Sequence, residues 1–291
     1  MHIWLVGAGY WGSKVKEALS KIPDVTDVTI VDIREGKTID DITTKDPVIL
    51  ATPLWQHASQ VIELLKRGHD VYCEKPLAET LEECMLLETL VRDQVLMVGH
   101  IFLYNPLLHE LKNVIDSGEL GIVHHIESRR LNWGIRQTKT TPLLSLAPHD
   151  VSIVNYLIPE AMSVTHAKGI SFSNNTVPDY VEFGDINYTI KVSWWWPKRE
   201  RIVTVIGDRG QAVWDEDSKQ VVVFAGKMDG DYPVREVATR VINYTGPSPL
   251  ENELAHFVDC VKTRKTPRTD VNNAVQVAEV LDAAAGYLSL K

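Results

Sequence analysis

The chain is poor in cysteine, lacks any long apolar run and has fewer basic than acidic residues. Its 291 residues include only three cysteines, Cys73, Cys84 and Cys260. An odd number at these spacings fits neither a disulfide framework nor a zinc knuckle, so we expect a reducing compartment. No apolar stretch approaches the roughly 20 residues of a membrane span, and no secretory signal precedes the first apolar segment. These absences predict a cytoplasmic protein.

The charge balance argues against two classes of partner. Lys and Arg number 30 and Asp and Glu number 39, which gives a formal net charge of -9. An acidic surface repels nucleic-acid phosphates and anionic lipids, so we expect neither nucleic acid nor membrane as a partner. The apolar fraction of 44% and the charged fraction of 24% are typical of a globular protein, and the length favours two domains.

Strands and helices alternate over the first third of the chain. Apolar strands are expected over His2–Val6, Val28–Asp32, Val48–Thr52, Val71–Glu74 and Val95–Gly99. Helices are expected from Trp11 to Ile22 and over Ala58–Arg67 and Leu81–Arg92. This alternation is typical of right-handed βαβ crossovers that build a parallel sheet. The fold class is therefore α/β, with an N-terminal Rossmann domain, a doubly wound parallel sheet, over residues 1–102.

The pattern changes after residue 102. Helices are expected over Pro106–Ser117 and His149–Leu157, with a long strand over Val123–Leu131 between them. Strands then follow one another over Ser163–Lys168, Tyr180–Phe183, Ile186–Trp194, Arg201–Ile206, Gln211–Trp214 and Val221–Phe224, and two helices end the chain over Leu250–Lys262 and Val271–Leu288. Successive strands with short polar turns predict an open, mostly antiparallel sheet. Residues 103–291 are thus expected to form a C-terminal α/β domain.

The turn Gly7-Ala8-Gly9-Tyr10-Trp11-Gly12 points to a dinucleotide. It follows the first strand directly and opens a helix, which is the context that gives a G-x-G-x-x-G pattern its meaning. Gly7 permits the tight turn, Gly9 lets a pyrophosphate approach, and Gly12 lets the helix pack closely on the sheet. Tyr10 and Trp11 belong to the same turn. The alternative is a Rossmann-like turn that binds no nucleotide.

Asp32 and Arg34 bear on the choice of cofactor. Asp32 ends the second strand, where a carboxylate can accept hydrogen bonds from the adenosine ribose hydroxyls and repel a 2′-phosphate. This position favours NAD. Arg34 can offset the repulsion, so NADP remains an alternative.

Glu74-Lys75-Pro76 follows a buried strand, at the edge where open α/β sheets bind ligands. Taken alone, the tripeptide is better interpreted as a surface turn. Six further motifs accompany it in order: Ala51-Thr52-Pro53, His57, the run from Val98 to Pro106, Gly118-Glu119-Leu120-Gly121, the run from Leu146 to Ile153, and the tail Pro249-Leu250-Glu251-Asn252-Glu253-Leu254 with Phe257. With these motifs, the chain resembles the Gfo/Idh/MocA family of sugar and cyclitol oxidoreductases. The resemblance covers nearly the whole chain.

The resemblance implies hydride transfer between a nicotinamide and a sugar carbon, with a substrate-binding and oligomerisation domain after the Rossmann domain. It implies that Thr52, Pro53 and His57 line the cofactor crevice, and that Glu74 and Lys75 lie near the nicotinamide and its ribose. It also implies a homodimer or homotetramer through the C-terminal sheet, and a C-terminal helix that returns to the Rossmann domain. The run that holds His149 resembles members that act on sugars, often nucleotide-linked amino sugars.

His149 stands where the family places its catalytic histidine. An imidazole titrates near neutral pH and can remove the hydroxyl proton as hydride leaves, while Lys75 stabilises charge on the same oxygen. A lone histidine that opens a helix would otherwise be read as a cap. Many members carry Asp four residues earlier, but this chain has Ser145 there, so the carboxylate relay is absent and Lys75 and His149 remain as the catalytic pair. Asp150 points about 100° away from its neighbour on a helix and does not replace that carboxylate.

Other residues are weaker candidates. Arg129, Arg130, Asn132 and Arg136 can contact substrate hydroxyls or a diphosphate, or simply form a solvated basic stretch. Asn105 and Tyr104 can also face the sugar. The run Trp194-Trp195-Trp196 is read as core or subunit packing in preference to a platform for sugar stacking. His124 and His125 alternate on a strand and cannot face one metal, so no metal site is expected.

We therefore expect an NAD(H)-dependent dehydrogenase or reductase of a sugar, with the substrate possibilities including a nucleotide-linked amino sugar. Two alternatives belong to other classes. One is a glycosidase that oxidises its substrate transiently with bound NAD and produces no net NADH. The other is a non-enzymatic NAD(H) sensor, which would bind NADH and turn over no sugar.

Overall fold

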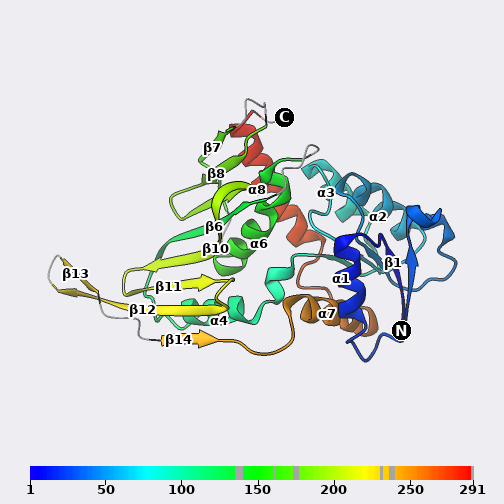
Figure 1. Cartoon of the computed structure of the whole chain (residues 1–291), viewed down its shortest axis with the longest axis horizontal. Helices are drawn as coiled ribbons and strands as arrows, with labels where there is room; N and C mark the ends of the chain where they lie inside the picture. Colours follow the sequence, from blue (N-terminus) through cyan, green and yellow to red (C-terminus); the bar gives the residue numbers. More distant parts are fainter. Residues whose placement is uncertain (135–139, 160–161, 173–176, 230–231, 236–239, 290–291) are drawn as a thin grey trace. The chain divides into compact units, whose positions relative to one another are not determined.

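The computed structural model describes residues 1–134, 140–159, 162–172, 177–229, 232–235 and 240–289. The chain divides into two compact units (Figure 1). Unit 1 comprises Met1–Tyr104 and Pro247–Glu279, and unit 2 comprises Asn105–Gly246 and Val280–Lys291. The segment Pro247–Glu279 thus groups with the first unit. From the sequence, this segment was expected in the second domain, with a C-terminal helix that returns to the Rossmann domain.

Unit 1 is built on a five-stranded sheet in the order β2-β1-β3-β4-β5 among its described residues. Every neighbouring pair is parallel, which confirms the predicted Rossmann sheet. The strands are β1 (His2–Val6), β2 (Asp27–Val31), β3 (Val48–Leu50), β4 (Val71–Cys73) and β5 (Leu96–Val98). The strand order reverses between β1 and β3, and such a switch point is where open α/β sheets bind ligands.

Helices connect the strands of unit 1, and one helix returns from the C-terminal part of the chain. They are α1 (Tyr10–Leu19), α2 (His57–Lys66), α3 (Leu81–Leu90) and α7 (Pro249–Thr263), with short 3-10 helices η1 (Ile33–Glu35), η2 (Ile39–Asp41), η3 (Leu54–Gln56) and η4 (Ile101–Tyr104). The helix α7 packs against α1 and η4. Its start is fixed by a capping box in which Ser248 and Glu251 satisfy each other's backbone N–H groups.

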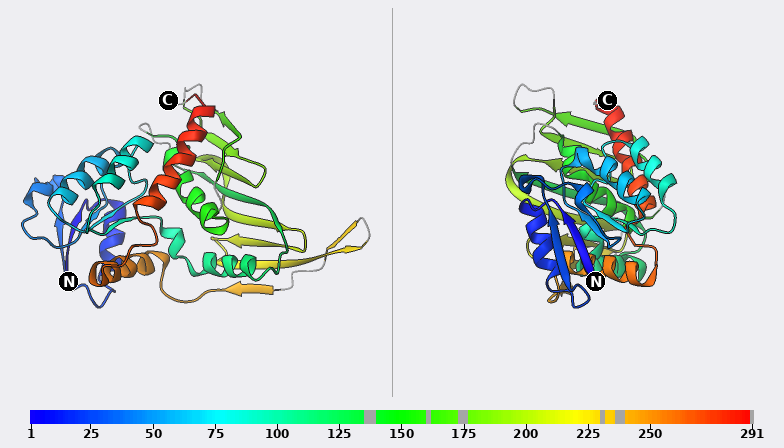
Figure 2. Two further views of the ribbon diagram at one scale, coloured as in Figure 1. Left: turned by 180° about the vertical axis from the view of Figure 1, so that it is seen from behind. Right: turned by 90° about the vertical axis from the view of Figure 1, so that its right-hand side faces the viewer.

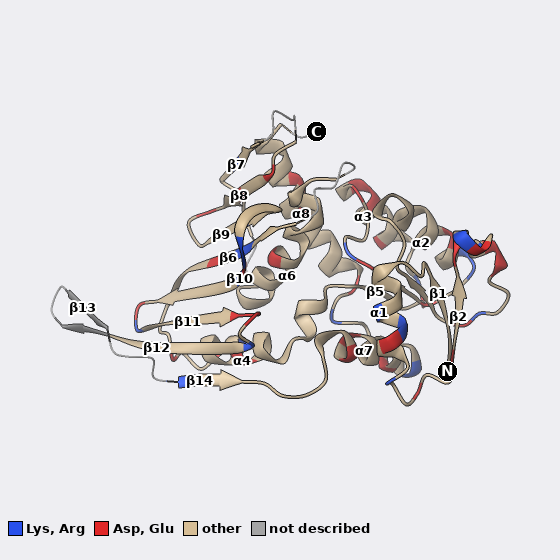
Figure 3. Ribbon diagram, in the orientation of Figure 1, with Lys and Arg blue, Asp and Glu red and all other residues tan. Residues whose placement is uncertain are grey.

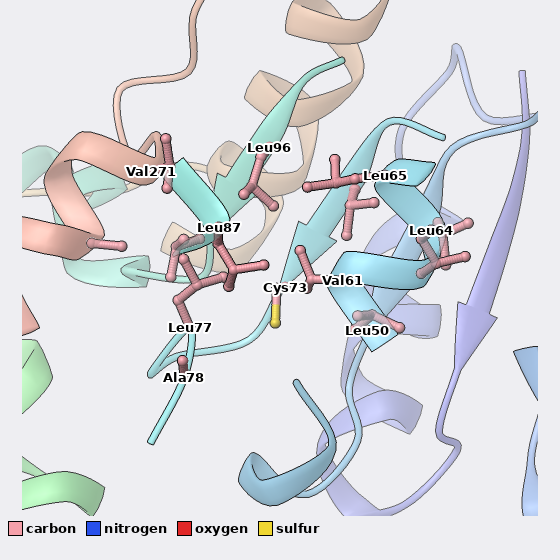
Figure 4. Close-up of a cluster of buried hydrophobic side chains, with 14 of the residues drawn as sticks. Leu50, Val61, Leu64, Leu65, Cys73, Leu77, Ala78, Leu87, Leu96 and Val271 are labelled. Atoms are coloured by element: carbon pink, nitrogen blue, oxygen red, sulfur yellow. The ribbon is translucent and has the colours of Figure 1, made fainter. Parts of the chain in front are cut away.

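The helical periodicity of α2 explains how this helix contributes to the hydrophobic core of unit 1. Val61, Leu64 and Leu65 recur at helical spacing and are buried, together with Leu50 of β3 and Cys73 of β4. Figure 4 shows these side chains converging between α2 and the strands. Gly68, with φ +81, ends the helix as the sequence predicts. Burial of this apolar face holds the carboxyl ends of β3 and β4 next to each other.

Unit 2 contains a nine-stranded sheet among its described residues, with the path β13-β12-β11-β10-β6-β9-β8-β7 and β14 paired to β12. All pairs are antiparallel except β6 with β9, which confirms the predicted mostly antiparallel sheet. The strands are β6 (Val123–Trp133), β7 (His166–Ile170), β8 (Tyr180–Gly184), β9 (Tyr188–Ser193), β10 (Trp195–Gly207), β11 (Gly210–Asp215), β12 (Gln220–Asp229), β13 (Tyr232–Arg235) and β14 (Arg240–Asn243).

Three helices of unit 2 lie against this sheet. They are α4 (Pro106–Asp116), α5 (Pro142–Ser145) and α6 (Ala147–Leu157), and α6 packs on β6 and β9 (Figure 2). The last helix, α8 (Val271–Tyr287), begins in unit 1 and ends in unit 2. Among the described residues, no helix is both long and apolar enough to cross a membrane.

A buried ion pair fastens α6 to the sheet. Nε of Arg130 on β6 lies 2.7 Å from Oδ2 of Asp150 on α6, and the side chains are 6% and 1% exposed. The hydroxyl of Ser128 donates to Oδ1 of Asp150 at 2.7 Å. Since Asp150 directly follows His149, this contact anchors the first turn of the helix that carries the expected catalytic histidine.

Candidate active site

The glycine turn after β1 has the geometry that a dinucleotide requires. Gly7 has φ +91, and a Cβ at this position would lie 2.6 Å from the carbonyl oxygen of Ala51. A Cβ at Gly12 would lie 2.0 Å from the carbonyl oxygen of Gly7. A Cβ at Gly9 would meet nothing within 4 Å. Gly7 and Gly12 are thus needed for the packing of the turn, whereas Gly9 leaves its backbone open to a ligand.

The N-terminus of α1 fits a pyrophosphate as well. Gly9 is the N-cap of α1, and no side chain among the described residues caps the helix. The first N–H groups of such a helix and its positive dipole end attract an anion. Tyr10 projects into solvent with 80% of its surface exposed, and Lys14 lies over its ring at 5.1 Å. The residues present therefore fit the phosphates of a dinucleotide.

Asp32 follows β2 and is tied to the same turn. Its Oδ2 accepts the backbone N–H of Ala8 at 2.7 Å and Nη2 of Arg34 at 2.7 Å, while Oδ1 accepts Nε of Arg34 at 2.8 Å. These bonds, with Arg34 first, hold the pKa of the carboxyl far below its usual range. Arg34 is largely exposed. The position expected to read the adenosine ribose therefore consists of a carboxylate with a guanidinium folded over it.

Thr52 and His57 hold the loops at the carboxyl ends of β3 and β4. The Thr52 hydroxyl donates to Gln60 at 2.7 Å, and Pro53 starts η3. The ring of His57 is buried, with Nδ1 2.8 Å from the carbonyl oxygen of Pro76 and Nε2 2.9 Å from that of Thr52. Burial lowers the pKa of His57. Its contacts join the two loops to each other, which gives it a role in shaping the crevice.

Glu74 and Lys75 leave the end of β4 at the same edge of the sheet. Oε1 of Glu74 accepts the indole N–H of Trp11 and the hydroxyl of Tyr72, the latter at 3.1 Å. Glu74 is buried, whereas Lys75 is half-buried. Burial raises the pKa of Glu74, and the bond from Trp11 and the charge of Lys75 counter that rise. The structure thus joins the glycine turn to Glu74 through Trp11, within unit 1.

His100 is a site candidate that the sequence analysis missed. It follows β5 at the same edge, is 1% exposed, and finds no partner for Nδ1 among the described residues. Burial and the charge of Lys75 lower its pKa to about 3, so the ring is neutral near pH 7. Its signal in the sequence is its place in Val98-Gly99-His100 at the carboxyl end of a parallel strand. A buried neutral imidazole here can donate or accept one hydrogen bond.

His149 lies in the first turn of α6, in unit 2. The ring is half-buried, and the backbone N–H of His149 donates to the carbonyl of Leu146 at 3.3 Å. Ser145 is the last residue of α5, and its backbone N–H donates to Thr141 at 2.9 Å. Asp150 is committed to Arg130 and Ser128, so it does not replace the absent family aspartate.

The remaining substrate candidates have separate surroundings. Asn105 is buried and caps α4 by accepting the N–H of Leu107 at 3.0 Å, so a substrate contact would have to use its amide nitrogen. The Tyr104 hydroxyl is buried 3.0 Å from Thr269, which gives it a packing role in place of the sugar-facing position expected. Asn132 lies near the end of β6 and is half-buried. Arg136 lies outside the described residues.

Arg129, Arg130 and the tryptophan run make contacts within the fold of unit 2. Arg129 pairs with Glu127 at 3.1 Å and with Glu200 at 3.0 Å, and Arg130 is buried against Asp150. Neither forms the solvated basic loop or the free phosphate fork considered from the sequence. Trp194 is 3% exposed, whereas the Trp195 ring lies against that of Trp133, tilted by 32° with ring centres 4.6 Å apart.

Charges of both signs are interspersed over the molecule, as Figure 3 shows. Acidic residues are in excess overall, with a net charge of -9. The positive groups Lys75 and Arg34 both follow strands of the unit 1 sheet at their carboxyl ends. This edge combines N–H groups, one carboxylate–guanidinium pair and one lysine, a donor set suited to a dinucleotide.

The chain is similar to proteins of known sequence and to solved structures. A 2,7-anhydro-N-acetylneuraminate hydratase of Mediterraneibacter gnavus is 25% identical over 245 residues, which cover 71% of this chain and 65% of that protein. Among solved structures, the UDP-N-acetylglucosamine 3-dehydrogenase from Acidithiobacillus ferrooxidans superposes with a TM-score of 0.81 at 16% identity, covering 99% of both chains. A levoglucosan dehydrogenase in complex with NADH and levoglucosan superposes with a TM-score of 0.82 at 19% identity, covering 100% of this chain and 97% of that chain.

Two family descriptions together match most of the chain. Residues 25–100 match the oxidoreductase family with an NAD-binding Rossmann fold, and residues 112–286 match the C-terminal alpha/beta domain of the same family. The glycine turn, the parallel sheet order and the donors at its edge agree with that NAD-binding description. The chain therefore belongs to the Gfo/Idh/MocA family of oxidoreductases.

Proposed function

We propose that this protein transfers a hydride between NAD(H) and a hydroxyl-bearing carbon of a sugar. The observation that carries the proposal is the NAD-type edge of unit 1, where the open backbone at Gly9 and the half-buried Lys75 come from the same sheet. Bound there, the nicotinamide ring supplies hydride acceptance or donation. Unit 1 is accordingly assigned to the cofactor, and unit 2 to the substrate and to subunit contacts.

Lys75 and His149 are assigned the acid–base chemistry. Oxidation of an alcohol needs a group that takes the hydroxyl proton, and a half-buried imidazole such as His149 suits that role in either direction of the reaction. The ammonium group of Lys75 stabilises negative charge that develops on the substrate oxygen. Asn132 and Arg136 are assigned to substrate hydroxyls or a diphosphate, and Asn105 to the same group through its amide nitrogen.

The test is a pair of variants with matched controls. His149→Ala and Lys75→Met should each lower turnover by ~10² or more while NADH still binds. His124→Ala, at an exposed histidine of β6, and Lys66→Met, at the exposed end of α2, should leave turnover within about twofold, as surface substitutions usually do. Full activity in either active-site variant would overturn the role of that residue.

The substrate class is proposed to be a free or nucleotide-linked sugar, with amino sugars included. The names of the solved UDP-N-acetylglucosamine 3-dehydrogenase and levoglucosan dehydrogenase support a sugar, although both are below 20% identical. The experiment is a screen of free sugars and nucleotide sugars with NAD and with NADP, followed at the nicotinamide absorbance band. Faster reduction of NAD would agree with Asp32, whereas equal rates would assign Arg34 to a 2′-phosphate.

A redox-neutral reaction is the second candidate, and it is favoured by one observation. A relative that is 25% identical over an alignment covering 71% of this chain is named as a 2,7-anhydro-N-acetylneuraminate hydratase. Adding water to a substrate leaves the nicotinamide unchanged at the end of the cycle. Substrate loss without net NADH formation would select this candidate, and stoichiometric NADH would select the dehydrogenase.

The sheet of unit 2 is proposed as the contact between subunits of a homodimer or homotetramer. On β6, Ile126, Ser128 and Arg130 are buried, whereas the intervening Glu127 and Arg129 are half-exposed. Those half-exposed residues carry charge pairs of both signs, which suits a self-complementary contact. Light scattering should give a mass of about two or four times the 32.7 kDa of one chain. A monomer at all concentrations would overturn this assignment.

A further inference from the structure

Two carboxyl groups in unit 1 share one buried tyrosine. Tyr72 of β4 and Glu253 of α7 are both 0% exposed, and Glu74 is 8% exposed. The Tyr72 hydroxyl oxygen lies 3.1 Å from Oε1 of Glu74 and 3.0 Å from Oε2 of Glu253. Phe257 packs edge-on against the Tyr72 ring at 5.8 Å and closes the cluster on one side. The three polar groups thus form a continuous buried chain from α7 to the end of β4.

Counting hydrogens shows that this chain holds an extra proton. A tyrosine hydroxyl carries one hydrogen and can donate one bond. Tyr72 therefore donates to only one of the two glutamates, and the second oxygen–oxygen contact is a hydrogen bond only when the other carboxyl group carries a proton. Two carboxylates that face one hydroxyl would also repel each other strongly, because the site is buried and water does not screen their charges. One of the two glutamates is therefore a carboxylic acid.

The donors around each carboxyl group identify which one is protonated. Glu74 accepts bonds from the Trp11 indole and from the backbone N–H of Lys75, and it feels the charge of the Lys75 ammonium. Oε1 of Glu253 has no donor among the described residues. A bare buried oxygen costs less on a neutral acid than on a carboxylate. Glu74 therefore carries the charge and Glu253 carries the proton.

The electrostatic surroundings agree with this assignment. Burial, and then the charge of Glu74, raise the pKa of Glu253 well above its usual range. Besides Tyr72 of β4 and Glu74, which follows β4, the described residues include one more titratable group that interacts with Glu253, Tyr104 of η4. Tyr104 is a neutral phenol near pH 7, because burial raises its pKa further. Among the described residues, the side chains that shift the pKa of Glu253 are Glu74 and Tyr72, and neither is a cation that would hold Glu253 as a carboxylate.

We propose that Glu253 is a positioning residue that holds a proton: it donates to Tyr72, and through Tyr72 it fixes Glu74 as the single carboxylate beside Trp11 and Lys75. This inference deepens the proposed NAD(H) function, because it rests on Glu74 and Lys75 as cofactor-binding residues. Because Glu253 is neutral, the cluster carries a single negative charge, on Glu74. The hydrogen bond from the Tyr72 hydroxyl holds the Glu74 carboxylate in place beside Trp11 of the glycine turn.

Infrared difference spectroscopy of the protein without cofactor tests the proton directly. The carbonyl stretch of a carboxylic acid is separate from that of a carboxylate and from the amide bands. We expect an acid band in the wild-type protein at neutral pH that disappears in Glu253→Gln and moves in Tyr72→Phe. Absence of the band, or its loss in Glu74→Gln with retention in Glu253→Gln, would overturn the assignment.

Glu251→Gln provides the matched control. Glu251 lies on the same helix, pairs with Lys21 at 2.7 Å, and has a pKa lowered by that lysine, so it contributes no acid band at neutral pH. The band should therefore be unchanged in this variant. If Glu253→Gln fails to fold, ¹³C-labelled glutamate in the wild-type protein decides instead: the band must shift with the label, and a band that stays in place refutes a glutamic acid.

Cofactor affinity tests the positioning role. Gln at residue 253 keeps an N–H donor for Tyr72, whereas Leu has none. NADH affinity should therefore stay within about twofold in Glu253→Gln and fall about tenfold in Glu253→Leu, the size expected when a buried bond is lost. Wild-type affinity in Glu253→Leu would overturn the positioning role. A wild-type protein that binds no NADH would instead refute the proposed function, and the infrared result would still decide the proton.

Discussion

The buried pair of Arg130 and Asp150 makes a quantitative prediction about unit 2. Removing one partner of such a pair leaves an uncompensated buried charge, which costs about 3–5 kcal/mol. The two single substitutions should differ. Glu216 lies 3.6 Å from Nη1 of Arg130 and can offset its charge, whereas within the described part of the chain the other side-chain donor to Asp150 is the neutral hydroxyl of Ser128. Arg130→Met should therefore cost about 5 kcal/mol and Asp150→Leu about 3 kcal/mol.

Removing both charges together should restore much of the loss. In Arg130→Met/Asp150→Leu no buried charge is left unpaired, so the free energy of unfolding should lie within about 2 kcal/mol of wild type. Because the chain has two compact units, local stability is best measured by hydrogen exchange of the β6 amides. Arg199 pairs with Asp217 at 2.9 Å on the surface, and Arg199→Met should cost under about 1 kcal/mol.

Two outcomes would refute this reasoning. One is an Arg130→Met protein that loses less than about 1 kcal/mol, which would mean that Asp150 is not effectively buried as a charge. The other is a double variant as unstable as the worse single variant. That result would show that the cost comes from lost packing and not from charge.

Three further predictions concern unit 1. Gly9→Ala should leave the unfolding midpoint unchanged, because its Cβ enters open space, but it should weaken NADH binding, because that space is where the pyrophosphate approaches. Gly12→Ala should also lower the unfolding midpoint, because its Cβ would lie 2.0 Å from the carbonyl oxygen of Gly7. Thermal unfolding and NADH titration of both variants separate the two effects. The pKa of Asp32 is lowered on folding, so its contribution to stability is present above the unfolded value of about 3.9 and is lost as pH falls. Asp32→Asn should therefore show a shallower loss of stability than wild type as pH falls below about 4, and parallel curves would contradict this. The pKa of Glu253 is raised on folding, so wild type should lose stability relative to Glu253→Gln as pH rises above about 4.3, as measured by urea midpoints from about pH 5 to about pH 8.

Local rules made the geometry of the glycine turn predictable. The role of Gly12 depends on its neighbours in one turn, and the Cβ distances reproduce the reasons for which glycine is needed there. The strand β1 has its predicted bounds, and the first helix starts within one residue of Trp11. These features need only periodicity, a turn and adjacent residues, all of which the sequence contains.

The strand pairing of unit 2 was less accessible. A strand was expected from Arg201 to Ile206, but β10 runs from Trp195 to Gly207. The polar run after Trp196 hides this strand, since it lacks the alternation of a half-buried strand. The extension exists because Trp195 pairs with Trp133 across a register shift. Such a pairing depends on the partner strand, and one strand's own pattern does not contain it.

The site residues divide in the same way. Motifs predict Lys75 and His149 as the catalytic pair, which stays a prediction. The sequence left Arg130 open as a substrate contact or as part of a solvated basic stretch, whereas the structure has it as a buried cation paired with Asp150. From the sequence alone, an arginine on a strand is expected to be exposed, because burial requires a partner such as Asp150 on another element. Only the packing of α6 on β6 reveals that partner. A catalytic assignment for a charged strand residue therefore needs its burial first.

Glu253 shows what a sequence can still indicate about such partners. It lies next to Leu254 and one turn before Phe257, on the face of α7 that is buried. Charged residues are almost never fully buried without a partner, so a glutamate on an apolar helix face signals a partner elsewhere in the fold. The identity of that partner is not local: Tyr72 is 181 residues away and sits in a strand of otherwise apolar residues. The pattern thus marks where a buried proton or ion pair must lie, and the fold decides which of the two it is.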